Sequence, residues 1–166
     1  MPDKDTLERA RADKRRGKAA STQAGEFVRE EMEHIREGKH GARSTKQAIA
    51  IGLSKARRAG VDLPPPAKGT TSEKTRRSAK RAYAAGQRHD KHVSRTRSRA
   101  ITGVLKHEAH TAASRKSIAK QATSAARHRS AADRSGAARK AAKTKGTAGR
   151  SAAARKAART RARRRH

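Results

Sequence analysis

Cysteine is absent from the 166 residues of this chain. Disulfide bonds and thiolate metal sites are therefore excluded, and nothing in the composition indicates an oxidising compartment. Tryptophan is absent as well, and Phe27 and Tyr83 are the only phenylalanine and tyrosine. Modules that bind single strands by base stacking need aromatic platforms. Any contact with nucleic acid is therefore expected to depend on backbone electrostatics rather than on base recognition.

Large apolar side chains are also scarce. Leucine, isoleucine, valine and phenylalanine number 4, 5, 4 and 1, which makes 14 of 166 residues. A highly charged chain with less than about 20% of these residues is expected to be disordered. No apolar run approaches the roughly 18 residues of a membrane span, and residues 1–5 lack the apolar stretch of a signal peptide. We expect a soluble cytoplasmic protein without a membrane partner.

Acidic residues are few, because 45 Lys and Arg stand against 14 Asp and Glu, a formal net charge of +31. Residues 1–40 hold 10 basic and 9 acidic side chains, whereas residues 41–166 hold 35 and 5. Arg outnumbers Lys, 28 to 17, and the planar guanidinium makes bidentate contacts to phosphate. Charge of this size concerns partners and solubility more than fold. It predicts a polyanionic partner, for which nucleic acid is the commonest choice.

The clearest helical pattern lies in residues 22–60. Thr22 is placed as an N-cap, and Gly38 is placed to end that helix. Its apolar residues recur at i, i+4 and i+7, namely Val28, Met32 and Ile35. Ser44 and Gln47 have the spacing of a capping box for a second helix, which Gly60 ends. Its apolar stripe consists of Ile49, Leu53 and Ala56.

The short loop between these two helices predicts an antiparallel hairpin within residues 22–63. The first helix is rich in glutamate and the second has only basic charges, so their attraction is expected to support the pairing. Burial of so few apolar side chains does not offset the entropy of ordering the chain. The hairpin is therefore expected to pair with another copy, with another protein, or with a helix from its own tail.

The rest of the chain divides by composition. Residues 1–21 are charged and are expected to be mobile. Three prolines at 64–66 begin a basic linker, residues 64–108, as a stiff polyproline spacer. Short helices are expected in it near 72–86 and 98–109.

The tail, residues 109–166, contains 20 Ala and 18 Lys or Arg among its 58 residues, with Ile118 as its single large aliphatic and Asp133 as its single acid. Residues 134–145 match residues 150–161 at 9 of 12 positions, and Gly146 and Gly149 between the copies are expected to break a continuous helix. The fold class expected from these patterns is mostly α and largely disordered. A helical hairpin is followed by a tail that is disordered, or helical on binding.

Two resemblances follow from these residues. The tail repeats are similar to the Lys/Ala-rich repeats of linker-histone tails and of bacterial linker-histone-like proteins. Residues 26–60 combine an acidic helix, the loop Gly38-Lys39-His40-Gly41, and the runs Lys-Gln-Ala-Ile-Ala-Ile and Ala-Arg-Arg-Ala-Gly. This pattern, over about residues 22–63, resembles a family of small bacterial proteins of unknown function that are often labelled plasmid stabilisation proteins. The resemblance implies a setting but no mechanism.

No catalytic or metal site is expected. The sequence has no nucleophile elbow and no P-loop, and a hairpin with so small a core cannot enclose a pocket for paired carboxylates. His89 with His92, and His107 with His110, have the spacing of helical metal ligands. No apolar surroundings would orient them, so solvated histidines are expected. The prediction is a protein that is not an enzyme, with no cofactor, no metal and no small-molecule substrate.

The hairpin offers two further sites. Its Gly-rich loop leads into a helix N-terminus, a natural anion site. The candidate phosphate contacts there are Lys39, His40, Arg43 and Lys46. The second helix could also read a DNA groove through Lys46, Gln47 and Lys55, but a protein–protein pairing module is favoured over this by about two to one.

The function expected from the whole pattern is sequence-nonspecific nucleic-acid binding, chiefly histone-like, nucleoid-associated binding and compaction of DNA through phosphate contacts. The alternatives are an RNA-binding or ribosome-associated basic protein, and an adaptor whose hairpin binds a protein partner. The residues predicted to contact phosphates are Arg127, Arg129, Arg134, Arg139, Lys140, Lys143, Lys145, Arg150, Arg155, Lys156, Arg159, Arg161, Arg163, Arg164 and Arg165.

Overall fold

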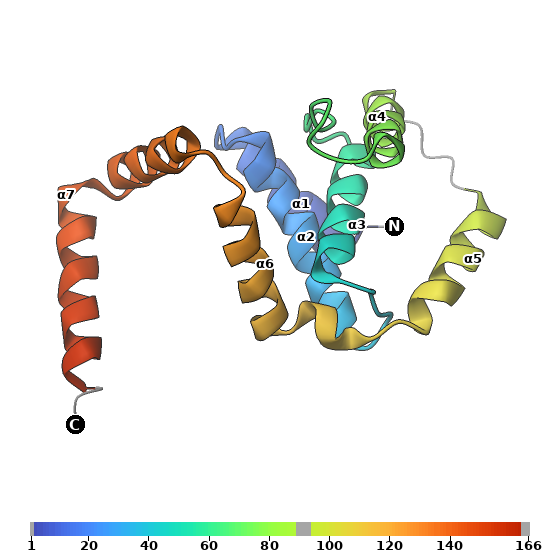
Figure 1. Cartoon of the computed structure of the whole chain (residues 1–166). Coiled ribbons are helices and arrows are strands. Elements are labelled where there is room, and N and C mark those ends of the chain that lie inside the picture. The colour runs from blue at the N-terminus through green and yellow to red at the C-terminus, as the bar shows by residue number, and fades with distance from the viewer. Residues whose placement is uncertain (1, 89–93, 164–166) are drawn as a thin grey trace. The chain divides into compact units, whose positions relative to one another are not determined.

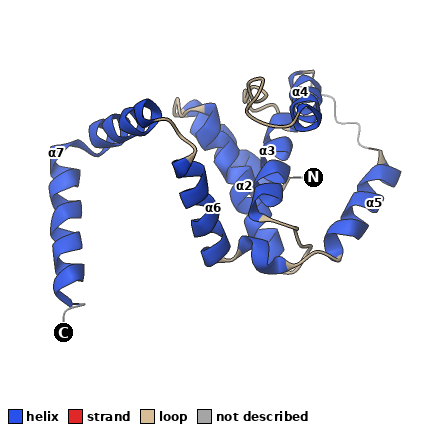
Figure 2. Ribbon diagram, in the orientation of Figure 1, coloured by secondary structure: helices blue, strands red, loops and turns tan. Residues whose placement is uncertain are grey.

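The computed structural model describes residues 2–88 and 94–163, which form helices and no strand (Figure 1; Figure 2). The chain divides into an N-terminal unit, residues 1–121, and a C-terminal unit, residues 122–166. The helices are α1 (Lys4–Arg15), α2 (Ala20–Arg36), α3 (Thr45–Arg58), α4 (Glu73–Gln87), α5 (Arg95–Lys106), the short 3-10 helix η1 (His110–Ala113), α6 (Arg115–Arg127) and α7 (Ala131–Arg163).

The prediction of a largely disordered chain was wrong, because helices account for most of the described residues, including those of the basic tail. That prediction counted only large apolar side chains. The N-terminal unit instead builds its core from alanine, which supplies nine of the 14 buried apolar residues in the described part. Alanine favours helix and loses no rotamer freedom on burial. Small residues also let helices approach closely, since a Cβ on Gly52 of α3 would lie 2.7 Å from the Cα of Val28 in α2.

Helices α2 and α3 form the expected antiparallel hairpin. Gly38 and Gly60, with φ of +75° and +85°, follow the two helices in left-handed conformations that end them. The Gln47 amide donates to Ser44 Oγ at 3.2 Å, as expected for the cap of α3. The Gln47 side chain accepts from the backbone N–H of Arg43 at 2.9 Å. The signals at Gly38, Ser44 and Gly60 therefore placed helix boundaries within about two residues. The prediction of Thr22 as an N-cap was wrong, because α2 begins at Ala20 and Thr22 lies inside it.

Two apolar clusters lie along the hairpin. Near the loop, buried Met32, Ile35 and Ala48 pack together, and near the open end Ala24, Phe27 and Ala56 do so. Helix α1 covers the second cluster with Ala10, which is buried, and with Leu7. The ion pair between Arg9 and Glu26, at 2.7 Å, also joins α1 to α2. Nothing was expected to hold a helix in residues 1–21, and that expectation was wrong because the hairpin itself holds α1.

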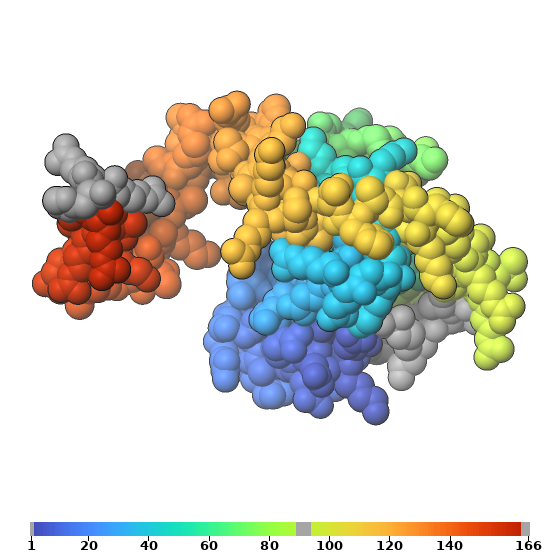
Figure 3. Space-filling model, turned by 90° about the horizontal axis from the view of Figure 1, so that it is seen from below, coloured from blue at the N-terminus to red at the C-terminus, as the bar shows by residue number. Residues whose placement is uncertain are grey.

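A later segment, residues 105–113, covers the first cluster and lies across the loop between α2 and α3 (Figure 3). Four hydrogen bonds attach it: Gly41 N to Leu105 O at 2.8 Å, Ala42 N to Ala109 O at 3.1 Å, Thr45 Oγ1 to Ala112 O at 2.6 Å, and Arg36 Nε to Ala113 O at 2.9 Å. Gly41 is required here, since a Cβ would stand 1.8 Å from Glu108 O.

The tail predicted to begin at residue 109 therefore starts inside the N-terminal unit. Ala112 and Ala113 of η1 are buried there, and Ile118 of α6 packs against the same cluster. Of the three partners expected for the hairpin, the chain's own tail provides this cover. Pairing with another copy or with another protein stays a prediction.

Helix α4, which was expected near residues 72–86, packs against α3. Ser72 caps it by accepting from the amide of Thr75 at 3.2 Å. Gly86 lies so close to α3 that a Cβ would stand 1.8 Å from Arg57 O. The three prolines at 64–66 do not hold α4 away from the hairpin, because the guanidinium of Arg57 donates to Leu63 O and Pro64 O at 3.1 and 3.2 Å.

A buried ion cluster joins α2 to α3. Glu30 and Glu31 are 2% and 0% exposed, and Lys55 Nζ lies 3.1 Å from Glu30 Oε1 and 2.7 Å from Glu31 Oε2. Burial lowers the pKa of the Lys55 ammonium, but the pairing with these two carboxylates outweighs it and raises the pKa above its ordinary value. The expected attraction between the two helices is therefore concentrated at one internal contact.

Candidate nucleic-acid interface

The C-terminal unit contains the last residues of α6 and the whole of α7 (Figure 1). Helix α7 is broken at Gly146, where φ is 64° and ψ is −179°. The break was expected there, and it places residues 134–145 on the first half of α7 and residues 150–161 on the second. Each half of α7 is therefore one copy of the sequence repeat.

The repeat places its charges at helical spacing. In the first half, Arg139, Lys140 and Lys143 stand at i, i+1 and i+4, and Arg155, Lys156 and Arg159 repeat this in the second half. Residues with this spacing share one side of a helix. The opposite side is formed by small residues, namely Ala137, Ala138, Ala141 and Ala142, and Ala153, Ala154, Ala157 and Ala158. The middle of each half therefore presents a cationic side and an alanine side, whereas the cations at its ends, Arg134 and Lys145 or Arg150 and Arg161, lie on the alanine side.

The cations of the C-terminal unit have no acidic partners within residues 122–163. All 13 described Lys and Arg side chains of this unit are exposed, and no ion pair of the described residues involves any of them. The one acid, Asp133, accepts from Ser130 Oγ at 2.7 Å, and its amide donates back to Ser130 Oγ at 3.0 Å. Ser130 therefore caps the start of α7, and Asp133 holds the hydroxyl of that cap and pairs with no arginine of the described residues.

The described residues include 13 of the 15 predicted tail residues, and all of these are exposed. Arg127 ends α6, Arg129 lies in the short connection, and the others lie along α7: Arg134, Arg139, Lys140, Lys143, Lys145, Arg150, Arg155, Lys156, Arg159, Arg161 and Arg163. The remaining two, Arg164 and Arg165, lie outside the described residues.

The loop residues predicted to hold a phosphate do not come together. Lys39 Nζ pairs with Glu37 Oε2 at 2.9 Å. His40 lies inward, with Nε2 3.4 Å from Glu31 Oε1. Arg43 and Lys46 are exposed. The amides of Gly41 and Ala42, which an anion would need, already donate to the carbonyls of Leu105 and Ala109. The geometry gives no support to a phosphate cradle at this loop.

The alternative that α3 reads a DNA groove also loses two of its three side chains. Lys55 is held by Glu30 and Glu31, and the side chain of Gln47 caps α3 by accepting from Arg43 N. Only Lys46 remains exposed among the three.

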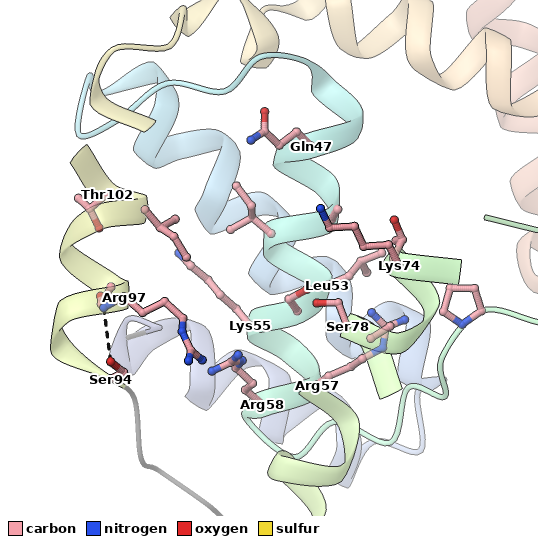
Figure 4. Close-up of a pocket in the computed structure, with 18 residues that line it drawn as sticks. Gln47, Leu53, Lys55, Arg57, Arg58, Lys74, Ser78, Ser94, Arg97 and Thr102 are labelled. Carbon is pink, nitrogen blue, oxygen red and sulfur yellow. Dashed lines mark hydrogen bonds between the residues drawn. The ribbon is translucent and has the colours of Figure 1, made fainter. Parts of the chain in front are cut away.

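A second basic surface was missed by the sequence argument. A groove between α3, α4 and α5 in the N-terminal unit has five Lys or Arg and no acid among its 18 lining residues (Figure 4). Arg58, Lys74 and Arg97 lie at its edges, whereas Arg57 is turned to the carbonyls of Leu63 and Pro64. Burial lowers the pKa of Arg57. The signal in the sequence was the lack of acids in α3 and α5, but only the fold brings the cations of α3, α4 and α5 to one groove.

Among the described residues, the histidines that were considered as metal ligands belong to no group of His, Asp and Glu side chains close enough to share a metal ion. His107 ends α5 and His110 begins η1, and both are exposed. His89 and His92 lie outside the described residues.

No described helix is long and apolar enough to cross a membrane.

Comparisons with known proteins give one match. No curated protein and no solved structure matches the chain. The expected resemblance to an uncharacterised family is confirmed at that level, because residues 11–68, which contain the whole hairpin of α2 and α3, match the sequence model of a family of unknown function (DUF6496).

Proposed function

We propose that this protein binds duplex nucleic acid, with DNA favoured, through phosphate contacts that do not depend on base sequence. The observation that carries the proposal is the C-terminal unit, whose 15 Lys and Arg face a single acid and whose described cations are exposed and outside ion pairs. Nothing inside that unit neutralises these charges. A phosphate backbone does so and releases its condensed counterions, which drives binding.

The form of α7 supports a duplex as the partner. The major groove of DNA admits an α-helix, and the alanine side of each half of α7 adds little bulk. Arginine and lysine on the other side reach phosphates across a groove edge, with guanidinium groups able to contact two oxygens at once. The break at Gly146 lets the two halves follow a curved backbone separately. The two halves of α7 repeat nearly the same Ala, Arg and Lys pattern, which supports contacts to backbone phosphates, and such contacts carry no sequence information directly.

The groove of the N-terminal unit supports a second phosphate contact. Arg58, Lys74 and Arg97 line it without an acidic residue among its lining. Two separate basic surfaces on one chain allow a protein to hold two duplex segments, which is how nucleoid compaction proceeds. We therefore place the protein in the cytoplasm, associated with the nucleoid. The compositional similarity of the repeats to linker-histone tails supports this proposal.

The test compares two variants that each lose four positive charges. The first, R139Q/K143Q/R155Q/R159Q, changes the cationic side of α7. The matched control, R11Q/K14Q/R15Q/R16Q, removes four exposed cations of α1 and its C-terminal end. Affinity for a duplex DNA is measured at several salt concentrations. Each lost phosphate contact lowers the salt slope by about 0.9, so the first variant should lower it by about 3 to 4 and the control by less than about 1. Equal slopes for the two variants would refute the assignment to α7.

Competition between duplex DNA and structured RNA at one salt concentration tests the choice of nucleic acid. The same cations would contact either backbone, so composition does not decide between them. If structured RNA displaces the protein from DNA preferentially, RNA becomes the proposed ligand. The residues proposed to contact phosphates stay the same.

A further inference from the structure

The buried ion cluster between α2 and α3 contains a carboxylate whose hydrogen-bonding capacity is unused. Both side-chain oxygens of Glu31 are buried and accept no hydrogen bond from the described residues. Lys55 Nζ pairs with Oε2 at 2.7 Å, so the oxygen that is left without a cationic or hydrogen-bonding partner among the described residues is Oε1. A buried charge without hydrogen bonds is costly unless something compensates it. The other oxygen, Oε1, faces His40.

The orientation of His40 leaves a lone pair directed at that oxygen. Its Nδ1 lies 3.1 Å from Gly41 O. A carbonyl only accepts, so Nδ1 carries the hydrogen and Nε2 of the neutral ring is an acceptor. That acceptor lies 3.4 Å from Glu31 Oε1, which is also an acceptor. A cation between the two atoms would turn this repulsion into attraction. A backbone carbonyl on the far nitrogen is also the usual way in which a metal-ligating histidine is oriented.

His34 completes the set. It stands three residues after Glu31 on the same side of α2, and one ligand atom each from Glu31, His34 and His40 lie within 4.8 Å of one another. His34 Nε2 lies 3.1 Å from Asp3 Oδ2, a carboxylate–histidine pair of the kind found behind metal ligands. The hydrogen bond from His34 lowers the pKa of Asp3. The side chains of His34 and His40 are 12% and 14% exposed, which leaves a route from solvent.

The distances and charges fit a divalent ion. Zinc bonds of about 2.1 Å at tetrahedral angles separate ligand atoms by about 3.4 Å, which is the distance from His40 Nε2 to Glu31 Oε1. The third ligand atom, from His34, lies within 4.8 Å of both. The carboxylates of Asp3, Glu30 and Glu31 against the ammonium of Lys55 leave two negative charges when both histidines are neutral. A divalent cation cancels both.

We propose that Glu31, His34 and His40 form a site for a zinc-class divalent transition ion, with Asp3 orienting His34. Two imidazoles and a carboxylate suit such an ion better than magnesium or calcium, which prefer oxygen ligands. The ion ties α2 to the loop before α3, and through Asp3 to the start of α1. The sequence argument considered histidines that are close in sequence, and it placed His40 at a phosphate. Only the folded hairpin brings His40 onto Glu31.

The test uses the untagged full-length protein, freed of nucleic acid at high salt and stripped of metal with a chelator. Zinc chloride is titrated in a calorimeter, and cobalt chloride is titrated with visible absorption as the readout of tetrahedral coordination. We expect one ion per chain, and proton release if a histidine loses a proton on binding. The variants H34Q and H40Q should each bind at least about 100-fold more weakly, and D3N should bind about 10–100-fold more weakly, as for other partners behind a ligand.

The matched control is H107Q/H110Q, which removes two exposed histidines outside the cluster and should keep full affinity. Circular dichroism shows whether each variant retains its helices, so that loss of binding is not confused with loss of fold. If the wild-type chain takes up no ion, the proposal is overturned. It is also overturned if H34Q and H40Q bind as the wild type does, or if the control loses binding equally.

Discussion

Both units of this chain are rich in alanine, lysine and arginine, but these residues have different surroundings in the two units. In the N-terminal unit alanines are buried between helices, and Lys55, Arg9 and Arg57 have acidic or carbonyl partners. In the C-terminal unit none of the described residues is buried, and its described cations lie outside ion pairs. Both units are helical, so helix content does not distinguish them. What differs is whether another helix covers the alanine side. Where a second helix covers the alanines, they form a core. Where no helix covers them, the cationic helix is exposed and can bind a partner.

Deletion of residues 131–166 is expected to have the largest effect. It removes 13 of the 15 cations of the C-terminal unit, and affinity for duplex DNA at about 0.1 M salt should fall at least about 100-fold. The thermal unfolding of the remaining chain should stay the same, because residues 1–121 contain the core. Binding is measured by fluorescence anisotropy and unfolding by circular dichroism. An unchanged affinity would contradict the division of roles between the units.

Replacement of Lys55 by methionine tests the buried ion cluster. Removal of one partner of a buried ion pair costs about 3–5 kcal/mol, and the partial exposure of Lys55 places the expected loss at about 3 kcal/mol. Urea unfolding measures it. The double variant K55M/E31Q should recover part of the loss, because the carboxylate of Glu31 is then no longer buried without its cation. Equal stability of the single variant and the wild type would show that the cluster does not hold α2 to α3.

Glycine-to-alanine variants sharpen the contrast between covered and uncovered helices. G41A places a Cβ 1.8 Å from Glu108 O, and overpacking of this kind costs about 1–3 kcal/mol. G136A in α7 meets nothing within 4 Å and should stabilise its helix by about 0.5–1 kcal/mol. Chemical unfolding of the full chain, followed by helix content, measures both. Similar effects of the two substitutions would contradict the difference in packing.

The smallest expected effect is the dependence of stability on pH. Because the pKa of Lys55 is raised in the folded state, its contribution is complete below the unfolded value near 10.5 and is lost as pH rises through the folded value. The pKa of Asp3 is lowered by its hydrogen bond with His34, so its contribution is present above its unfolded value and is lost as pH falls. Melting temperature against pH should decline at both ends. In K55M the alkaline decline should weaken and the acid decline should remain.

Several features followed from sequence because they depend on neighbouring residues. Gly38 and Gly60 ended helices, Ser44 and Ser72 began them, and Gly146 broke the tail. Left-handed backbone conformations and caps are satisfied within a few residues, and the charge of the tail needs no fold at all.

The remaining features depended on contacts between distant segments. Alanine is too small to be counted as a core residue until a second helix lies against it, which is why the burial of Ala24, Ala48 and Ala113 was missed. The direction of His40 was fixed by its carbonyl partner and by Glu31 across the hairpin. The sequence by itself therefore determined the net charge, the repeat and most helix ends, since these are local. Only the tertiary structure decided which alanines are buried and which charged groups face one another, because both depend on residues that are far apart in the chain.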